Sequence, residues 1–197
     1  MKIGVLAVQG DFDAHKRALS RIGVDATEVR RPADIDNIDG LIIPGGESTT
    51  MLKFITEENL GTAIENFAKK GKPVFGTCAG AILLAREVKN PAQPSLALID
   101  ITVERNSYGR QVDSFIGEAD CSMEGGPLEA VFIRAPRIKE VGAGVTVLAK
   151  VGGEPVLVRE GNILVATFHP ELTQDTRTHH LFVNITGGDS RIQTLRF

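Results

Sequence analysis

The chain has 197 residues, of which 42% are hydrophobic and 24% are charged, and its formal net charge is −3. This slightly acidic composition gives no bulk attraction to nucleic acid, and no apolar run approaches the roughly 20 residues that a membrane-spanning helix needs. Because the chain has only two cysteines and its first residues lack the long apolar core of a signal peptide, we expect a reduced, cytoplasmic protein rather than a secreted disulfide scaffold.

The first half of the chain alternates predicted strands and helices. Short β-branched and apolar runs predict strands over residues 2–8, 24–29, 41–43 and 73–77. Apolar residues at helical spacing predict helices over residues 12–22, 47–55, 60–70 and 79–88. This order predicts an α/β fold, a three-layer sandwich in which helices cover both faces of a mostly parallel central sheet. Ligands of such sheets bind at the carboxyl ends of the strands.

The second half of the chain is richer in strands. They are predicted over residues 98–104, 130–135, 145–151, 155–159 and 163–168, and a last helix is predicted over 176–185. Glu160-Gly161-Asn162, between the final two strands, is a tight-turn signal that predicts a hairpin. The prolines in residues 89–95 indicate a loop or crossover rather than a domain linker, so we expect residues 1–197 to form a single domain.

Cys78 lies at the turn between a predicted strand and a predicted helix, in the sequence Gly76-Thr77-Cys78-Ala79-Gly80. This G-x-C-x-G pattern has the spacing of the G-x-S-x-G nucleophile elbow, where a strained turn exposes the nucleophile and small flanking residues avoid collisions. The N-terminus of the following helix would stabilise a thiolate, and the Ala79 N–H would donate to an oxyanion. A small buried cysteine in a glycine-rich turn is the alternative interpretation, and this pattern alone does not decide between the two.

Of the four histidines, His169 is the candidate base. It follows a predicted strand, and Glu171, two residues further on, can turn its carboxylate toward the ring and orient it as the third member of a triad does. A strand-terminal histidine beside a solvated glutamate is the alternative interpretation. His15 is expected to pack or to lie at an interface, and His179 and His180 are expected to be surface or capping residues.

A glycine-rich segment, Pro44-Gly45-Gly46-Glu47-Ser48-Thr49-Thr50, joins a predicted strand to a predicted helix. Three interpretations of it stay open. It is a phosphate loop, although no lysine completes a Walker pattern, or Ser48 or Thr49 caps the helix, or its backbone N–H groups provide the second donor of an oxyanion hole.

Together these residues resemble the triad-type, class I glutamine amidotransferases, whose fold is flavodoxin-like. The motifs that carry the resemblance are GTCAG after a strand, the GGEST loop and the distant FHPE. Within that family the chain is most similar to the glutaminase subunits of pyridoxal 5'-phosphate synthases. The narrower resemblance spans residues 1 to about 185 and is carried by VLAVQGDFDAH, LIIPGGESTTM, ERNSYGRQVDSF, VFIRAP and ATFHPELTQDTRTHHLF.

The resemblance implies a role for each matching position. Cys78 would be the nucleophile, His169 the base and acid, and Glu171 the residue that orients His169. The N–H groups of Gly46 and Ala79 would form the oxyanion hole. The glutamine site would be lined by Gly46, Glu47, Ser48, Arg105, Ile133 and Arg134. Taken from the residues alone, Arg105 is an exposed loop residue, Arg134 a surface charge at a strand end, and Cys121 structural.

The implied activity is hydrolysis of L-glutamine to L-glutamate and ammonia through a cysteine thioester. The ammonia would pass to a partner synthase subunit that makes pyridoxal 5'-phosphate (vitamin B6) from ribose 5-phosphate and glyceraldehyde 3-phosphate. The resemblance implies no cofactor, and no cysteine and histidine spacing suggests a metal site. The alternatives are a glutaminase subunit of a different synthase, a Cys-His peptidase, or a non-catalytic regulatory module of the same fold.

Overall fold

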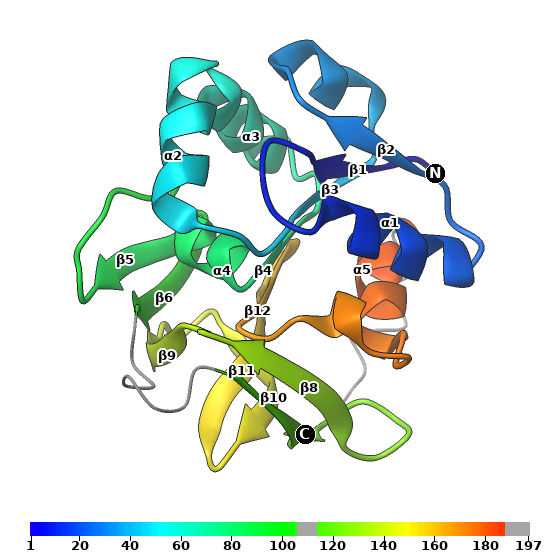
Figure 1. The fold of residues 1–197 in the computed structure, drawn as a ribbon, viewed down its shortest axis with the longest axis vertical. Coiled ribbons are helices and arrows are strands. Elements are labelled where there is room, and N and C mark those ends of the chain that lie inside the picture. The colour runs from blue at the N-terminus through cyan, green and yellow to red at the C-terminus, as the bar shows by residue number, and fades with distance from the viewer. Residues whose placement is uncertain (106–113, 188–197) are drawn as a thin grey trace.

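The computed structural model describes residues 1–105 and 114–187, whose fold is shown in Figure 1. Residues 106–113 of the ERNSYGRQVDSF stretch and the tail beyond Gly187 lie outside the described residues. The helices are α1 (Phe12–Arg21), α2 (Ser48–Glu57), α3 (Leu60–Lys69), α4 (Ala79–Leu84) and α5 (Arg177–Gly187), with short 3-10 helices η1 (Pro32–Asn37) and η2 (Pro170–Leu172). The strands are β1 (Ile3–Leu6), β2 (Ala26–Val29), β3 (Gly40–Ile43), β4 (Val74–Thr77), β5 (Ala85–Lys89), β6 (Ile99–Glu104), β7 (Ser114–Cys121), β8 (Leu128–Ile133), β9 (Arg137–Val141), β10 (Thr146–Val151), β11 (Glu154–Glu160) and β12 (Ile163–Ala166).

Within the described residues, the central sheet has nine strands in the order β2-β1-β3-β4-β12-β11-β10-β7-β8. All neighbours from β2 to β12 are parallel, which is the flavodoxin-like order of a doubly wound fold. All neighbours from β12 to β8 are antiparallel, so hairpin-type pairing extends the parallel half. The predicted hairpin is confirmed, because β11 and β12 pair across the turn at Gly161 and Asn162.

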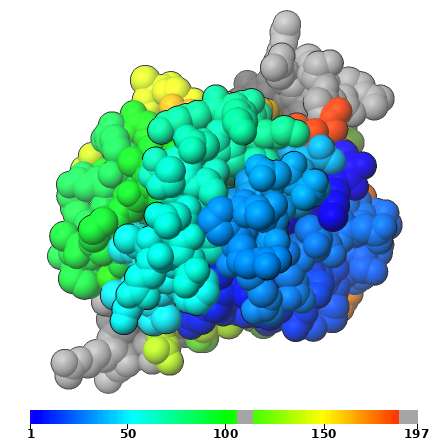
Figure 2. All heavy atoms as spheres, turned by 90° about the horizontal axis from the view of Figure 1, so that it is seen from above, coloured from blue at the N-terminus to red at the C-terminus, as the bar shows by residue number. Residues whose placement is uncertain are grey.

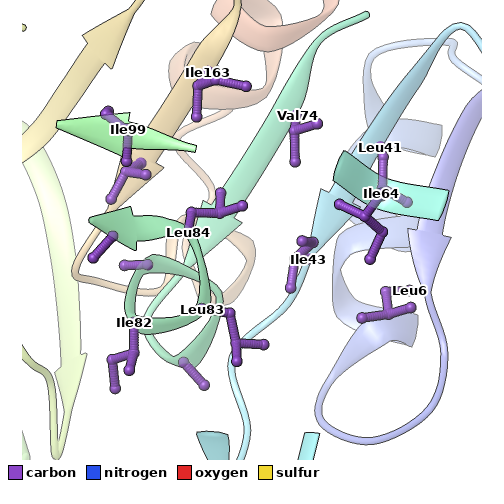
Figure 3. Packing of buried hydrophobic residues seen from close by; sticks show 14 of the residues in the cluster. Leu6, Leu41, Ile43, Ile64, Val74, Ile82, Leu83, Leu84, Ile99 and Ile163 are labelled. Atoms are coloured by element: carbon purple, nitrogen blue, oxygen red, sulfur yellow. The ribbon is translucent and has the colours of Figure 1, made fainter. Parts of the chain in front are cut away.

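Helices cover both faces of the parallel half, which confirms the predicted three-layer arrangement (Figure 1). α2, α3 and α4 pack on one face, and α1 and α5 pack on the other. Each face has its own hydrophobic core: the first core lies against α2, α3 and α4, and the second core lies against α1 and α5. Successive side chains of a strand point to opposite faces, so Leu41 and Ile43 belong to the first core and Ile42 belongs to the second. Figure 3 shows the first core, where Ile64 of α3 and Leu83 of α4 lie among the side chains of the parallel strands.

The predicted helix over 79–88 is wrong in its second half. α4 ends at Leu84, and the chain continues as β5, which pairs with β6 in a separate three-stranded sheet of order β5-β6-β9. The six residues of α4 are all buried, whereas β5 exposes Arg86 and Glu87 and buries Val88. Pairing with β6 therefore overrides the local helical pattern. β7 and β9 were not predicted either.

The surface view complements the ribbon. Figure 2 shows the cyan atoms of α2 and α3 packed between blue N-terminal segments and the green segment that contains β5. Within the described part of the chain, no helix combines the length and apolar character needed to cross a membrane.

The carboxyl ends of β1, β3, β4 and β12 meet at one edge of the sheet, because these strands are parallel neighbours.

Candidate active site

Cys78 directly follows β4 and directly precedes α4, as the elbow pattern requires. Its backbone has φ 49° and ψ −102°, a conformation that residues other than glycine rarely adopt. Such backbone strain costs free energy and is found mainly at functional sites. A Cβ on Gly76 would lie 2.7 Å from backbone atoms of Gly80, and a Cβ on Gly80 would collide with the carbonyl oxygen of Ile43. The flanking glycines are therefore required by close packing of the turn against β3 and against itself.

His169 and Glu171 form a hydrogen-bonded pair at the end of β12. Nδ1 of His169 lies 2.7 Å from Oε1 of Glu171, and the Glu171 side chain is fully buried. The chain does not stay extended between them, because Pro170 starts the 3-10 helix η2. This turn places the Glu171 carboxylate beside Nδ1 of the imidazole ring.

Charge and burial act against each other at His169. Burial disfavours the imidazolium, but hydrogen bonds to the Cys78 and Glu171 side chains outweigh it and raise the pKa of His169 to about 10. Burial also tends to raise the pKa of Glu171, yet the neighbouring His15 and His169 rings more than offset this and lower it. The pair therefore favours an imidazolium facing an ionised carboxylate.

Cys78 and His169 open into a pocket of about 540 Å³, a volume suited to a small ligand. The pocket brings together the predicted site residues from widely separated parts of the chain, namely Gly46, Glu47, Ser48, Cys78, Ala79, Arg105, Ile133, Arg134 and His169. Glu171 does not line it and lies behind His169. No group of three or more His, Cys, Asp or Glu side chains within residues 1–105 and 114–187 is placed to hold a metal ion.

The glycine-rich loop after β3 forms one wall of this pocket. A Cβ on Gly45 would lie 3.4 Å from Cβ of Cys78 and would collide with the His169 ring. The backbone N–H of Glu47 donates to Oε1 of Gln9 at 3.0 Å, which ties the loop to the segment between β1 and α1. The loop therefore sits against the thiol and the imidazole, where its backbone can face a bound carbonyl group.

The N-terminal cap of α2 is Glu47, and neither Ser48 nor Thr49 has that role. The Glu47 carboxylate accepts hydrogen bonds from the backbone N–H groups of Thr49 and Thr50 at 3.0 and 2.7 Å. A hydrogen bond from the Thr50 hydroxyl is the largest contribution that lowers the pKa of Glu47 to about 2. Glu47 is therefore a fixed negative charge at the rim of the pocket.

Arg105 is neither free nor fully exposed, because its side chain has only 16% relative exposure. Its Nη1 donates to Oε1 of Gln93 at 2.6 Å, and its Nη2 lies 3.7 Å from Oε1 of Glu47. Gln93 Oε1 also accepts a hydrogen bond from the Ser48 hydroxyl at 3.1 Å. Gln93 is a residue that sequence reasoning missed, and it joins two predicted substrate contacts.

Ile133 and Arg134 reach the pocket from the end of β8. The Ile133 carbonyl oxygen lies 3.8 Å from Sγ of Cys78, close enough to accept a weak hydrogen bond from the thiol. Arg134 has a left-handed φ of 44° and an exposed side chain on the pocket wall. Left-handed backbone in a residue other than glycine is a form of strain found at functional sites.

The remaining histidines and Cys121 lie away from the pocket. His15 is fully buried, as expected for a packing residue, and its Nε2 lies 3.4 Å from Oε2 of Glu171. The prediction that His179 is a surface or capping residue is wrong, because α5 turns it inward against α1, where it is completely buried; His180 is exposed. Cys121 ends β7, is half-buried and does not line the pocket.

Three comparisons with known proteins bear on this site. The model of the SNO glutamine amidotransferase family matches residues 5–186. A Koribacter versatilis (strain Ellin345) protein named "Pyridoxal 5'-phosphate synthase subunit PdxT" is 57% identical over 94% of this chain and 95% of its own length. The protein of the same name from Thermosipho africanus (strain TCF52B) is 53% identical over 94% of this chain and 98% of its own.

Solved structures agree with these matches. A crystal structure titled as a glutamine amidotransferase superposes with a TM-score of 0.88 at 47% identity, over 94% of this chain and 98% of that one. The structure of PurLQS from Thermotoga maritima aligns with a TM-score of 0.72 at 17% identity, over 93% of this chain and 97% of that chain, and at this identity it supports the fold alone.

Proposed function

The chain belongs to the SNO glutamine amidotransferase family, and we propose that it is the glutaminase subunit of a pyridoxal 5'-phosphate synthase. The observation that carries the proposal is one constellation: a cysteine on a strained elbow shares a pocket with a histidine whose Nδ1 lies 2.7 Å from a buried carboxylate. The proposal treats residues 1–197 as one glutaminase domain, because both hydrophobic cores pack on the same central sheet.

The first half of the reaction forms a thioester. The Cys78 thiolate attacks the side-chain amide carbon of L-glutamine, and the electron pair of the C=O π bond moves to oxygen. Backbone N–H groups of Gly46 and Ala79, at the pocket wall, stabilise this oxyanion. The imidazolium of His169 then gives its proton to the amide nitrogen, the C–N bond breaks, and ammonia leaves.

The second half hydrolyses the thioester. Neutral His169 takes a proton from water, the resulting hydroxide attacks the thioester carbon, and the C–S bond breaks. This step restores the Cys78 thiolate and the His169 imidazolium and releases the product as its γ-carboxylic acid, which gives its proton to water to form L-glutamate, so protons and electrons balance over the cycle. Glu171 never contacts the substrate; it holds the imidazole through Nδ1 and stabilises the imidazolium.

Charged groups around the pocket suit an amino acid substrate. Arg105 and Arg134 line the same pocket and can pair with the α-carboxylate, whose two oxygens match a guanidinium fork. The ionised Glu47 at the rim provides a negative charge for the α-ammonium group. Ser48 lines the same pocket, and its hydroxyl donates a hydrogen bond to Gln93.

The ammonia is proposed to pass directly to a synthase subunit that joins it to ribose 5-phosphate and glyceraldehyde 3-phosphate. The relatives quoted above carry the name of a synthase subunit, which supports a hetero-oligomeric partner. Ile133 and Leu172, which line the pocket, are 40% and 42% exposed, and such apolar side chains suit coverage by another protein surface. We place this complex in the cytoplasm, where thiols such as Cys78 stay reduced.

Glutamate release at saturating glutamine, with and without the synthase subunit, tests the proposal. We expect slow release by the chain alone and a clear rise when the synthase subunit is added. A chain that releases no glutamate under either condition would not be a glutaminase. If an unrelated synthase stimulates glutamate release and the pyridoxal 5'-phosphate synthase subunit does not, the chain would belong to a different complex.

A further inference from the structure

His15 lies behind the proposed triad and faces polar groups from three other elements. Its Nε2 lies 3.1 Å from Oγ1 of Thr77 and 3.4 Å from Oε2 of Glu171. Its Nδ1 lies 3.0 Å from Nε2 of His179. All of these side chains are buried. A continuous polar chain thus runs from α5 through α1 to the Glu171 oxygen that does not bind His169.

The positions of the ring hydrogens follow from two constraints. Nε2 of His15 must carry its hydrogen, because a lone pair there would face a carboxylate oxygen of Glu171. Nδ1 of His179 is buried and has no hydrogen-bond partner among residues 1–105 and 114–187, and a lone pair is less costly there than an unsatisfied N–H. His179 therefore donates from Nε2 to Nδ1 of His15, and His15 donates from Nε2 to Oγ1 of Thr77, with Oε2 of Glu171 3.4 Å from the same nitrogen.

Both rings are neutral in this arrangement. Burial is the largest effect on each, lowering the pKa of His15 and lowering that of His179 to about 3. At His15, Glu171 and Asp11 favour the charged form and His169 opposes it. At His179, Glu171 favours the charged form, while His15, Arg21 and His180 oppose it. Neutral rings can form the directed donor chain, whereas two adjacent imidazolium ions could not.

We propose that His15 is a positioning residue that holds Glu171 ionised and directed at His169, and that His179 fixes the tautomer of His15 that this task requires. The Glu171 side chain has no exposure, and its Oε2 accepts no hydrogen bond within the described residues. The N–H of His15, 3.4 Å away, thus supplies the positive end of a dipole at a buried charge. The proposal rests on the proposed role of Glu171 in the triad.

Two substitutions of His15 distinguish the roles of its two ring nitrogens. The amide nitrogen of His15→Gln reaches the position of Nε2 and keeps a donor toward Thr77 and Glu171. The shorter amide of His15→Asn reaches only the position of Nδ1 and leaves Glu171 without that donor. Both variants replace the ring by an uncharged amide, so loss of the imidazole itself is common to the two.

The measurement is the titration of His169, followed by NMR with ¹⁵N-labelled histidine, together with the pH profile of glutamate release in the complex with the synthase subunit. In His15→Asn we expect the pKa of His169 and the alkaline limb of the profile to fall by about one pH unit, because the carboxylate beside the ring is less firmly ionised. In His15→Gln both should stay close to the parent values. Identical titrations in the parent and both variants, or equal shifts in both variants, would overturn the proposal.

The NMR titration keeps this test separate from the proposed function, because it reports on His169 even if the chain hydrolyses no glutamine. If His15→Asn does not fold, His179→Leu and His179→Gln make the same comparison one link further back. The leucine variant removes the donor that fixes the His15 tautomer and should lower the His169 pKa, whereas the glutamine variant keeps a donor and should not. An unchanged titration in a folded His179→Leu protein would contradict the tautomer assignment.

Discussion

Gly45 and His169 are in direct contact across the pocket. The Cε1 atom of the imidazole occupies the space that a Cβ on Gly45 would need, and Nδ1 lies 3.1 Å from that position. The absence of a side chain at Gly45 is therefore what lets the ring stand beside the thiol. A methyl group there would displace the imidazole, whereas its distance of 3.4 Å from Cβ of Cys78 is an ordinary van der Waals contact.

Gly45→Ala should consequently lower the rate of glutamate release by about a hundredfold or more, because a displacement of about 1 Å in a catalytic group costs this much. Gly117→Ala is the matched control, since its Cβ would make only ordinary contact with the Phe115 ring, the nearest atom being 3.4 Å away. Steady-state assays with the synthase subunit measure both. A Gly45→Ala enzyme as active as Gly117→Ala would show that the ring is not held where the structure places it.

Replacement of the proposed nucleophile should remove hydrolysis and leave the fold intact. Cys78→Ala puts a small residue in a turn that is already built from small residues, and triad members act as a unit, so the loss should reach several orders of magnitude. Cys121→Ala should retain activity, because that thiol lies outside the pocket. An inactive Cys121→Ala enzyme together with an active Cys78→Ala enzyme would show that Cys78 is not the nucleophile.

Substitutions of the proposed base and of the carboxylate that orients it should differ in how much activity they remove. His169→Asn removes the group that moves both protons and should be nearly as damaging as loss of the thiol. Glu171→Gln keeps an acceptor for the hydrogen on Nδ1 but removes the negative charge, so it should cost less. Single-turnover rates of thioester formation distinguish the two. A Glu171→Gln protein with the parent rate would remove Glu171 from the triad.

The buried neutral histidines predict that stability falls in acid. The pKa of His179 is lowered from 6.5 to about 3, so below pH 6.5 the unfolded chain binds a proton that the folded chain does not. By linkage this favours unfolding as the pH falls. His179→Leu should reduce the loss of unfolding free energy between pH 7 and pH 5 by about 2 kcal/mol, measured by denaturant titration. His180→Leu, on the exposed side of α5, is the control, and equal pH dependence in the two variants would contradict the prediction.

The sequence was most informative where the chemistry is local. The elbow needs only a strand, a few small residues and a helix in succession, so five adjacent letters made Cys78 a candidate nucleophile, and His169, Glu171 and the family resemblance then favoured it. The pairing of His169 with Glu171 spans only two residues, and His169 was chosen because it follows a predicted strand of the parallel sheet. The parallel half of the sheet followed from the alternation of apolar runs, and the resemblance to a known family added the proposed substrate-binding residues.

Contacts between residues far apart in the sequence could not be predicted from local sequence patterns. His15 and His179 are separated by 164 positions and meet only because α1 and α5 pack on the same face of the sheet. Gln93 lies in a loop with no readable pattern and gains its role from Ser48 and Arg105, which the fold brings to it. The early end of α4 has the same origin, because β5 is stabilised by its pairing with β6.

The central claim is that nitrogen released at Cys78 enters pyridoxal 5'-phosphate, and transfer of a label tests it most directly. The chain and the synthase subunit are incubated with glutamine labelled with ¹⁵N in its side-chain amide, together with ribose 5-phosphate, glyceraldehyde 3-phosphate and unlabelled ammonium. Mass spectrometry then measures ¹⁵N in the product. We predict a labelled pyridine ring with the parent chain and an unlabelled one with Cys78→Ala. Unlabelled product from the parent, or equal labelling with Cys78→Ala, would contradict the account.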